Sequence, residues 1–284
     1  MASLARAWGF TVLALVTTSP VLAQGTLTLN SIQFVRNATC WSTSPSADLR
    51  GASLPLTEDH LFEVGWWFRV AGDSQETAFP VPDTQLYLGD ISSNRWNDVG
   101  GRGLFAALES AQLFDYSSGS PTGFVGLTLT VTNLSTVNPL TLDIFNMADF
   151  DVQPIAANDT ATLVEWTPNR ILQINDSAGN FAQYVALSNS PITNHYLVRP
   201  FGATDVAAVL SDAAVTNFDD SGTPFGPGDF TAGWQFSMTL PPGGLGSASI
   251  YLSVNVGSNC YSIIGIFCDG LERGDPSLWS AAVP

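Results

Sequence analysis

Strict alternation of apolar and polar side chains is the main pattern along this chain of 284 residues. In residues 61–70, apolar side chains stand at every second position from Phe62 to Val70. Four further segments repeat the pattern: residues 127–131, 140–144, 234–240 and 248–256. A period of two sends alternate side chains to opposite faces of a strand, so each segment is expected to be a half-buried β-strand.

Weaker alternation predicts further strands over residues 85–89, 161–166, 170–174 and 181–187. The segment Thr26–Val35 also alternates, but its phase changes at Asn30-Ser31, which we expect to be a β-bulge within one strand. Residues 103–114 fit a helix or a strand, and both alternatives stay open.

Turn-forming residues separate these segments. The sequence PPGG at residues 241–244 joins two strongly alternating segments, which predicts a β-hairpin from Trp234 to Val256. One segment has helical spacing instead, with Thr204 as the expected N-cap and apolar positions at Val206, Val209, Leu210 and Ala213.

About ten strands with one or two short helices in the connections describe an all-β fold. We expect a large antiparallel β-sandwich of jelly-roll or supersandwich type. No internal repeat or change in composition marks a second domain. Residues 24–260 are therefore assigned to one β-sandwich domain, and residues 261–284 to a C-terminal tail.

The first 23 residues have the layout of a secretory signal peptide. Arg6 precedes an apolar run from Ala7 to Val16, and Val21-Leu22-Ala23 has the pattern that a signal peptidase recognises. We expect cleavage after Ala23 and a secreted chain that is extracellular, at the cell surface or in the periplasm. The apolar run is shorter than the roughly 20 residues of a membrane span, so no transmembrane segment is expected.

The charge composition narrows the choice of partners. The chain has 25 acidic residues, nine arginines and no lysine, and its formal net charge is −16. So few cations cannot form a basic groove, which excludes nucleic acid and disfavours docking on anionic lipid. Glycans or cell-envelope components are the expected partners, and the sequence does not define an oligomeric state.

Three cysteines are present, at Cys40, Cys260 and Cys268. In an oxidising compartment two of them are expected to form a disulfide. The short spacing favours Cys260 with Cys268, and Cys40 with Cys260 is the alternative. Because no C-x-x-C occurs, neither a redox motif nor a thiolate zinc site is expected.

Residues suited to catalysis are few. His60 stands at the start of a strand and His195 in a predicted loop, and neither belongs to a G-x-S-x-G or H-E-x-x-H motif. Sugar hydrolysis needs only two carboxylates, and the candidate pairs are Asp149 with Asp151, and Glu109 with Glu165. Such pairs arise freely in an acidic chain, so we expect no catalytic site.

A calcium ion is the one cofactor that the sequence suggests. Asp219, Asp220 and Asp229 lie in a loop rich in glycine and proline, where hard oxygen ligands suit calcium. The spacing is not that of an EF-hand. The competing interpretation is a loop whose aspartates bind its own backbone.

Trp67 is the candidate for a ligand platform. If its face of the strand is exposed, Trp67 with Trp41 or Trp96 provides a flat surface for sugar rings. A strand that is covered on both faces buries Trp66 and Trp67 instead, and this is the alternative that we favour.

The tail FCDGLERGDPSLWS, residues 267–280, resembles the F-x-D-G-F-E-S-G-D-x-S-x-W-S element that closes many secreted bacterial proteins. It departs from that element at Leu271 and Arg273. The resemblance implies an exported bacterial protein and no particular activity. A role of the tail in sorting or attachment is a hypothesis.

Residues 127–152, LTLTVTNLSTVNPLTLDIFNMADFDV, are similar to the T-V-T-N-x-S…N-H-x-Y-F-N-L region of aldose-1-epimerase-like supersandwich domains. Those enzymes place a catalytic histidine after the asparagine, whereas Met147 follows Asn146 here. The resemblance therefore implies a supersandwich fold without that acid–base chemistry.

These observations predict a secreted bacterial β-sandwich without catalytic function that acts as a surface, matrix or carbohydrate-interacting component. The alternative is a carbohydrate-active enzyme on a supersandwich scaffold that uses paired carboxylates.

The signal peptide gives the first testable prediction. In a bacterial host that exports the full chain, intact-mass analysis should find a mature product that begins at Gln24. Ala23→Arg should block processing, because signal peptidase requires a small side chain at that position. A wild-type product that keeps its leader would contradict the prediction.

Overall fold

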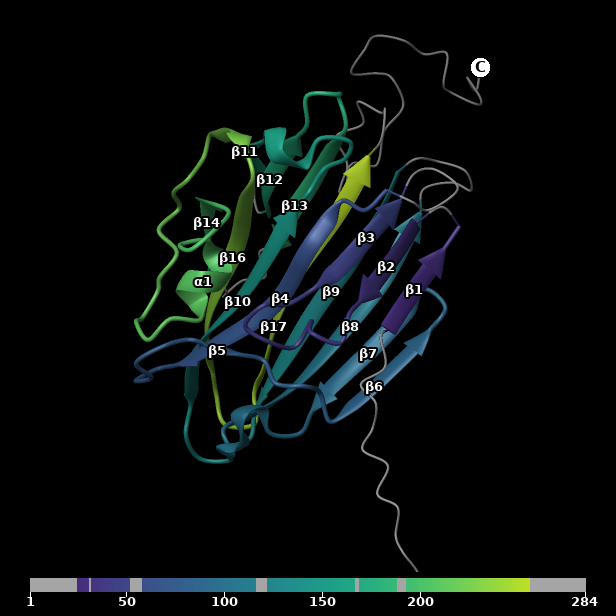
Figure 1. The fold of residues 1–284 in the computed structure, drawn as a ribbon. Helices are drawn as coiled ribbons and strands as arrows, with labels where there is room; N and C mark the ends of the chain where they lie inside the picture. The colour runs from purple at the N-terminus through teal and green to yellow at the C-terminus, as the bar shows by residue number, and fades with distance from the viewer. Residues whose placement is uncertain are drawn as a thin grey trace, which may run out of the picture.

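The computed structural model describes residues 25–30, 32–51, 58–115, 122–166, 169–187 and 193–255. Within these residues the fold is an all-β sandwich of two layers (Figure 1), as the alternating pattern predicts. No helix among them combines the length and the apolar character of a membrane span. The expected signal peptide, Cys260, Cys268 and the tail motif lie outside the described residues.

One layer is a nine-stranded antiparallel sheet with the order β15-β11-β12-β13-β17-β9-β8-β7-β6. In that order, its strands are Phe225–Gly228, Asp159–Trp166, Asn169–Asn175, Phe181–Leu187, Leu245–Asn255, Thr122–Asn133, Phe105–Asp115, Ile91–Trp96 and Thr84–Leu88.

The other layer contains two sheets. The five-stranded sheet has the order β14-β16-β10-β4-β5, with the bounds Thr193–Pro200, Phe230–Leu240, Leu140–Phe150, Leu61–Val70 and Thr77–Ala78. The three-stranded sheet contains β1 (Gly25–Leu29), β2 (Ile32–Arg36) and β3 (Ala47–Gly51). β3 lies beside β4 (Figure 1), and the His60 N–H donates to the Leu49 carbonyl at their junction.

Apolar side chains of the two layers meet in one core. Its members alternate along each strand, and they include Val64, Trp66, Phe68, Leu127, Leu129, Val131, Leu142, Ile144, Trp234, Phe236, Ile250 and Leu252. Burial of each such side chain stabilises the fold by about 1.5–3 kcal/mol. The predicted period of two is therefore confirmed on the inner faces.

The outer face of the five-stranded sheet is covered as well. The short helix α1 (Val206–Leu210) contributes to a second apolar cluster on this face, with the members Trp67, Phe145, Met147, Leu197, Val206, Ala207, Leu210 and Phe218. The expectation that residues 61–70 form a half-buried strand is therefore wrong, because β4 is buried on both faces from Val64 to Val70.

The predicted β-hairpin over residues 234–256 is also wrong, because β16 and β17 lie in different layers. Neither proline of the connecting residues 241–244 can donate a ladder hydrogen bond, and Gly243 has a φ of 66°. The Asn133 side-chain amide donates to the Pro241 carbonyl and holds the corner. The connection carries the chain across the sandwich.

The single bulged strand predicted over Thr26–Val35 is in fact two strands. β1 and β2 pair antiparallel, with Leu29 opposite Ile32. Asn30 has a φ of 48°, in the left-handed region that asparagine tolerates. The change of phase marks a reversal of the chain.

Three other local expectations are resolved. The predicted helix is present as α1, but its N-cap is Asp205, whose carboxylate accepts the Ala208 N–H. Residues 103–114 contain β8, so the strand alternative holds. His195 lies in β14 and not in a loop. The remaining short elements are the 3₁₀ turns η1 (Val99–Gly101) and η2 (Ala156–Asn158).

A buried carboxylate joins the layers. Glu109 on β8 is fully buried, and its oxygens accept from Arg36 Nη2 at 2.7 Å, from Trp66 Nε1 at 2.6 Å and from Asn94 Nδ2 at 3.1 Å. Arg36 also lies over the Trp41 ring, 4.8 Å from its centroid. The network connects β2, β4, β7 and β8.

Removing this carboxylate should destabilise the fold strongly. Glu109→Ala leaves the Arg36 charge buried without a counter-charge, which costs about 3–5 kcal/mol of unfolding free energy. Urea denaturation of the purified variant measures the loss. Glu165→Ala is the matched control, because Glu165 forms an ion pair with Arg170 but is 62% exposed, and its loss should stay below about 1 kcal/mol. Equal losses in the two variants would contradict the assigned role of the buried pair.

Candidate functional site

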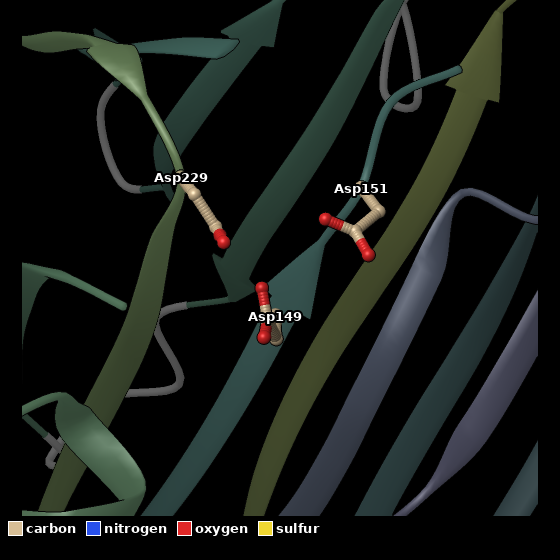
Figure 2. A group of neighbouring side chains, drawn as sticks. All are labelled: Asp149, Asp151 and Asp229. Atoms are coloured by element: carbon tan, nitrogen blue, oxygen red, sulfur yellow. The ribbon is translucent and has the colours of Figure 1, made fainter. Parts of the chain in front are cut away.

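Three aspartates converge at one end of the five-stranded sheet. Asp149 is the second-last residue of β10, Asp151 follows that strand directly, and Asp229 directly precedes β16. Each offers one carboxylate oxygen, and these three atoms lie within 4.8 Å of one another. Figure 2 shows the Asp151 and Asp229 carboxylates turned toward the space beside Asp149.

Strand register explains why these residues meet. β10 runs antiparallel to β16 and to β4, and Asp149 stands opposite Thr231 and Glu63. Asp229 lies two residues before Thr231, so the pairing brings it to the same end of the sheet. Asp149 shares the outer face of β10 with Phe145 and Met147, which belong to the apolar cluster beneath α1.

The Asp149 carboxyl lacks the partners that a buried acid normally has. Its side chain is 2% exposed, and its Oδ1 has no hydrogen-bond partner. Oδ1 of Asp229 is likewise buried and without a partner. Among the described residues, none of the ion pairs involves Asp149, Asp151 or Asp229.

Burial and like charge raise the pKa values of this group. The pKa of Asp149 rises to about 9, mainly because of burial and then because of the charges of Asp151, Asp229, Glu63 and Asp205. Burial also raises the pKa of Glu63, to about 7. It raises the pKa of Asp151 and of Asp229 as well.

A second buried acid adds to the negative potential. Asp159, at the start of β11, is fully buried and accepts the Val152 N–H at 3.0 Å with Oδ2. Its Oδ1 has no partner. Burial raises the pKa of Asp159 to about 8, and Asp176, Asp151 and Asp229 add to the shift. The end of the sandwich therefore collects several carboxyl groups that take part in none of the ion pairs among the described residues.

This arrangement offers the ligands of a hard cation. Carboxylate oxygens are the ligands that calcium and magnesium take in proteins. A hydrolase needs a concave pocket where the acids meet the substrate. One pocket of the described residues lies over β6, β7 and β8.

The second predicted carboxylate pair is not brought together. Glu109 on β8 and Glu165 on β11 are five strands apart in the nine-stranded sheet. Glu109 is fully buried in its network, and Glu165 is an exposed ion-pair partner of Arg170. Each glutamate therefore has its own partners within the fold, and the two do not form one site.

The two histidines lie apart as well. His60 is fully buried, its Nδ1 accepts the Gln153 N–H at 3.1 Å, and burial lowers its pKa to about 4. His195 Nδ1 lies 3.0 Å from Asp220 Oδ2 on the exposed side of β14. Neither histidine is hydrogen-bonded to an acid of the cluster.

The three aspartates that the sequence assigns to one calcium loop separate. Asp220 accepts from Arg170 Nη1 at 2.7 Å and from the Tyr196 N–H. Asp219 is exposed and accepts from the Ser221 hydroxyl. Only Asp229 joins the cluster, so the predicted ligand set is corrected.

The ligand platform at Trp67 is also corrected. The Trp67 side chain is fully buried in the cluster beneath α1, and its Nε1 donates to Ser211 Oγ. Trp41 and Trp96 pack against each other in the main core, with ring centroids 5.0 Å apart. The favoured alternative, burial of both Trp66 and Trp67, is confirmed.

An aromatic group on the outer face of the nine-stranded sheet was not predicted. Phe114 and Phe124 stack with centroids 4.6 Å apart, and Phe124 meets Tyr251 edge-on at 5.2 Å. Tyr251 lies over Gly126, where an added Cβ would come within 2.6 Å of the ring. Phe114 and Tyr251 are half-buried. The sequence signal for this group is Tyr251, which stands at one of the alternating positions of residues 248–256 that are otherwise polar.

A cavity of about 250 Å³ lies on the same sheet. Its lining residues come from β6, β7 and β8, and they are Leu86, Ile91, Ser92, Ser93, Ser110, Ala111 and Gln112. The strand register places Ile91, Gln112, Gly126 and Tyr251 in one row across the sheet. The cavity and the aromatic group therefore form one outer surface, which we call the aromatic face.

Asn146, the residue of the epimerase-like resemblance, has a structural role. Its Nδ2 donates to the Gly65 carbonyl at 2.9 Å, and its Oδ1 accepts from the Tyr184 hydroxyl at 2.6 Å. Met147 lies in the cluster beneath α1. The amide connects the two layers at this point.

No protein-family model matches the chain, and no curated protein matches it. Among solved structures, a bacterial glucoamylase in complex with acarbose matches with a TM-score of 0.53 and 10% identity, over 84% of this chain and 33% of the glucoamylase chain. The chain thus spans about a third of that protein, and at this identity the likeness concerns the fold alone. A putative kojibiose phosphorylase from the human microbiome covers 81% of this chain and 26% of its own, with 7% identity, but its TM-score of 0.31 carries no argument.

The acidic cluster predicts a pH dependence of stability. Between pH 6.5 and 9, the folded state holds protons on Asp149 and Asp159 that the unfolded state has lost, so the unfolding free energy should fall as the pH rises. The penalty is absent below about pH 4 and complete above about pH 9. His60 acts in the opposite direction, but only between about pH 4 and 6.5.

Urea denaturation in a chelating buffer at pH 6.5 and pH 9 measures this slope. Asp149→Asn should remove about 2 kcal/mol of the wild-type decline. Asp219→Asn serves as the control, because Asp219 is exposed, and it should leave the decline unchanged. A wild-type protein that becomes more stable across this range would contradict the prediction.

Proposed function

We propose that this protein acts outside the cytoplasm as a non-catalytic β-sandwich that interacts with carbohydrate at the cell surface or in the surrounding matrix. The observation that carries the proposal is the aromatic face, where stacked rings adjoin a cavity whose mainly apolar lining also carries serine hydroxyls and one glutamine amide. The layout of the leader supports action outside the cytoplasm.

The aromatic face has the chemistry that sugars need. Aromatic rings offer an apolar surface to the C–H side of a sugar ring, and nearby polar side chains fix the orientation of its hydroxyls. Here Ser93, Ser110 and Gln112 supply donors and acceptors beside the exposed side chain of Ile91. The acidic net charge favours a neutral ligand over an anionic one.

The shared fold gives a second, weaker support. A bacterial glucoamylase has the same sandwich fold over most of this chain. Fold does not determine function. The likeness therefore agrees with carbohydrate as the ligand, but it assigns no activity.

The environments of the candidate acids support a non-catalytic role. Glu109 is fixed by three donors, and His60 is buried. Asp149 is almost completely buried, out of reach of a substrate. None of these groups is free to exchange protons with a substrate.

A carbohydrate-active enzyme is the second candidate, and one observation favours it. Asp149 and Asp151, the predicted pair, lie close together and beside Asp229, and a glycosidase needs two neighbouring carboxyl groups. In that case the acids of the cluster would be catalytic, and the aromatic face would not be the primary site.

A glycan array with the purified mature chain tests the proposed function. We expect binding to at least one neutral glycan, and isothermal titration on that glycan should show that Tyr251→Ala weakens affinity about 3- to 10-fold through loss of ring stacking. Tyr251→Phe keeps the ring and should retain most of the affinity. Phe201→Ala, which removes an exposed ring paired with Phe62, is the control and should bind as the wild type does.

Two outcomes would refute the proposal. One is the absence of binding to every glycan on the array. The other is hydrolysis of the bound glycan, detected by chromatography of released sugars and abolished by Asp151→Asn, which would establish the second candidate instead.

A further inference from the structure

We propose that Asp149, Asp151 and Asp229 form a calcium-binding site that ties the end of β10 to the start of β16. This site is separate from the aromatic face: it lies at the outer face of the five-stranded sheet, whereas the aromatic face lies on the outer side of the nine-stranded sheet. Its test is therefore independent of any glycan.

The distances fit a single ion. Calcium takes oxygen ligands at 2.3–2.6 Å, so two oxygens on opposite sides of one ion lie about 5 Å apart. One carboxylate oxygen from each of the three aspartates falls within 4.8 Å of the others. Asp149 and Asp151 come from the end of β10, and Asp229 comes from the start of its partner β16 (Figure 2). Because the pairing of these two strands fixes their positions, the backbone would need little rearrangement to bind an ion.

The unpartnered oxygens are the second, independent observation. Asp149 is 98% buried, its Oδ1 has no hydrogen-bond partner, and Figure 2 shows its carboxylate at the space that Asp151 and Asp229 also face. Oδ1 of Asp229 is buried without a partner as well. Buried polar atoms are almost always hydrogen-bonded, since leaving one unpaired is costly. A cation bound among the three carboxylates would give this buried group the partner that it lacks.

None of the ion pairs among the described residues gives the three aspartates a positive partner. Arg199 stands opposite Thr231 on β14, but its Nη1 donates to the Thr204 carbonyl. Five arginines of the described residues form ion pairs with other acids, and these are Arg36, Arg50, Arg69, Arg102 and Arg170. The one buried histidine uses Nδ1 as an acceptor for the Gln153 N–H. The nearest additional charges, those of Glu63 and Asp205, are negative. A cation from solution would supply the counter-charge that these ion pairs do not.

The donor set selects the ion. All three ligands are carboxylate oxygens, without the nitrogen or sulfur that zinc and copper prefer. Calcium accepts irregular oxygen cages of six to eight ligands, whereas magnesium demands a near-ideal octahedron. Water molecules would complete the shell around the half-buried Asp151 and Asp229. Calcium sites of extracellular modules typically have a Kd of about 10⁻⁴–10⁻³ M.

Thermal unfolding of the mature chain with calcium tests the proposal. After EDTA treatment and desalting, addition of 10 mM CaCl₂ should raise the Tm of the wild type by about 5–10 °C, as expected at about 100 times the Kd. Magnesium chloride at 10 mM should give less than half of that shift. Sodium chloride of equal ionic strength should give almost none, because screening alone does not bridge the three carboxylates.

Two variants separate binding from folding. Asp149→Asn and Asp229→Asn each remove one charged ligand and should weaken calcium binding at least tenfold in isothermal titration. Without calcium, Asp149→Asn should have a Tm at or above that of the wild type, because it replaces a buried carboxyl group whose Oδ1 has no hydrogen-bond partner. In EDTA the variant should therefore have the higher Tm, and in calcium the wild type should. A folding defect would lower the Tm of the variant in both conditions.

Asp219→Asn is the matched control. Asp219 belongs to the same acidic loop as Asp229 but is exposed, so the variant should respond to calcium as the wild type does. The proposal is overturned by a wild-type Tm that calcium does not raise beyond the sodium control. It is equally overturned if Asp149→Asn and Asp229→Asn keep the full calcium shift, or if Asp219→Asn loses it.

Discussion

The carboxylate of Glu109 is the interaction on which the packing of the three sheets depends. It projects from the nine-stranded sheet into an otherwise apolar core, where it accepts hydrogen bonds from Arg36 of the three-stranded sheet and Trp66 of the five-stranded sheet. A buried ion pair of this kind tolerates only one geometry, because a shift of either layer leaves a charge unpaired. The network therefore fixes the position of the small sheet beside β4, while the surrounding apolar side chains supply most of the stabilisation.

Coverage of the five-stranded sheet on both faces determines where polar chemistry can lie. The apolar cluster beneath α1 occupies the middle of its outer face, around Trp67 and Phe145. Charged side chains are displaced to the two ends of the same strands. At one end Arg69 pairs with Glu76 and Asp143, so the acids there are neutralised. At the other end Asp149 has no such partner, and the same strand thus carries one balanced and one unbalanced group of charges.

Local alternation predicted the strands and the inner faces, but not how the strands associate. The chain reverses at Asn30 and changes layer between β16 and β17, and each event involves only a few residues. The conformation of the second connection depends on a residue distant in sequence, Asn133, which donates to the Pro241 carbonyl. The same limit applies to the sites. Asp149 and Asp151 stand out in the sequence, yet Asp229 joins them only through the pairing of β10 with β16. Burial of Trp67 depends on α1, about 140 residues later.

The crossing at residues 241–244 has a consequence for how the molecule meets its surroundings. Because the chain passes from one layer to the other there, the strand after Asp229 and the strand with Tyr251 are close in sequence but look outward in opposite directions. The rings of the aromatic face and the Asp149 group of the five-stranded sheet are therefore presented on opposite sides of the sandwich, so a single small ligand cannot contact both.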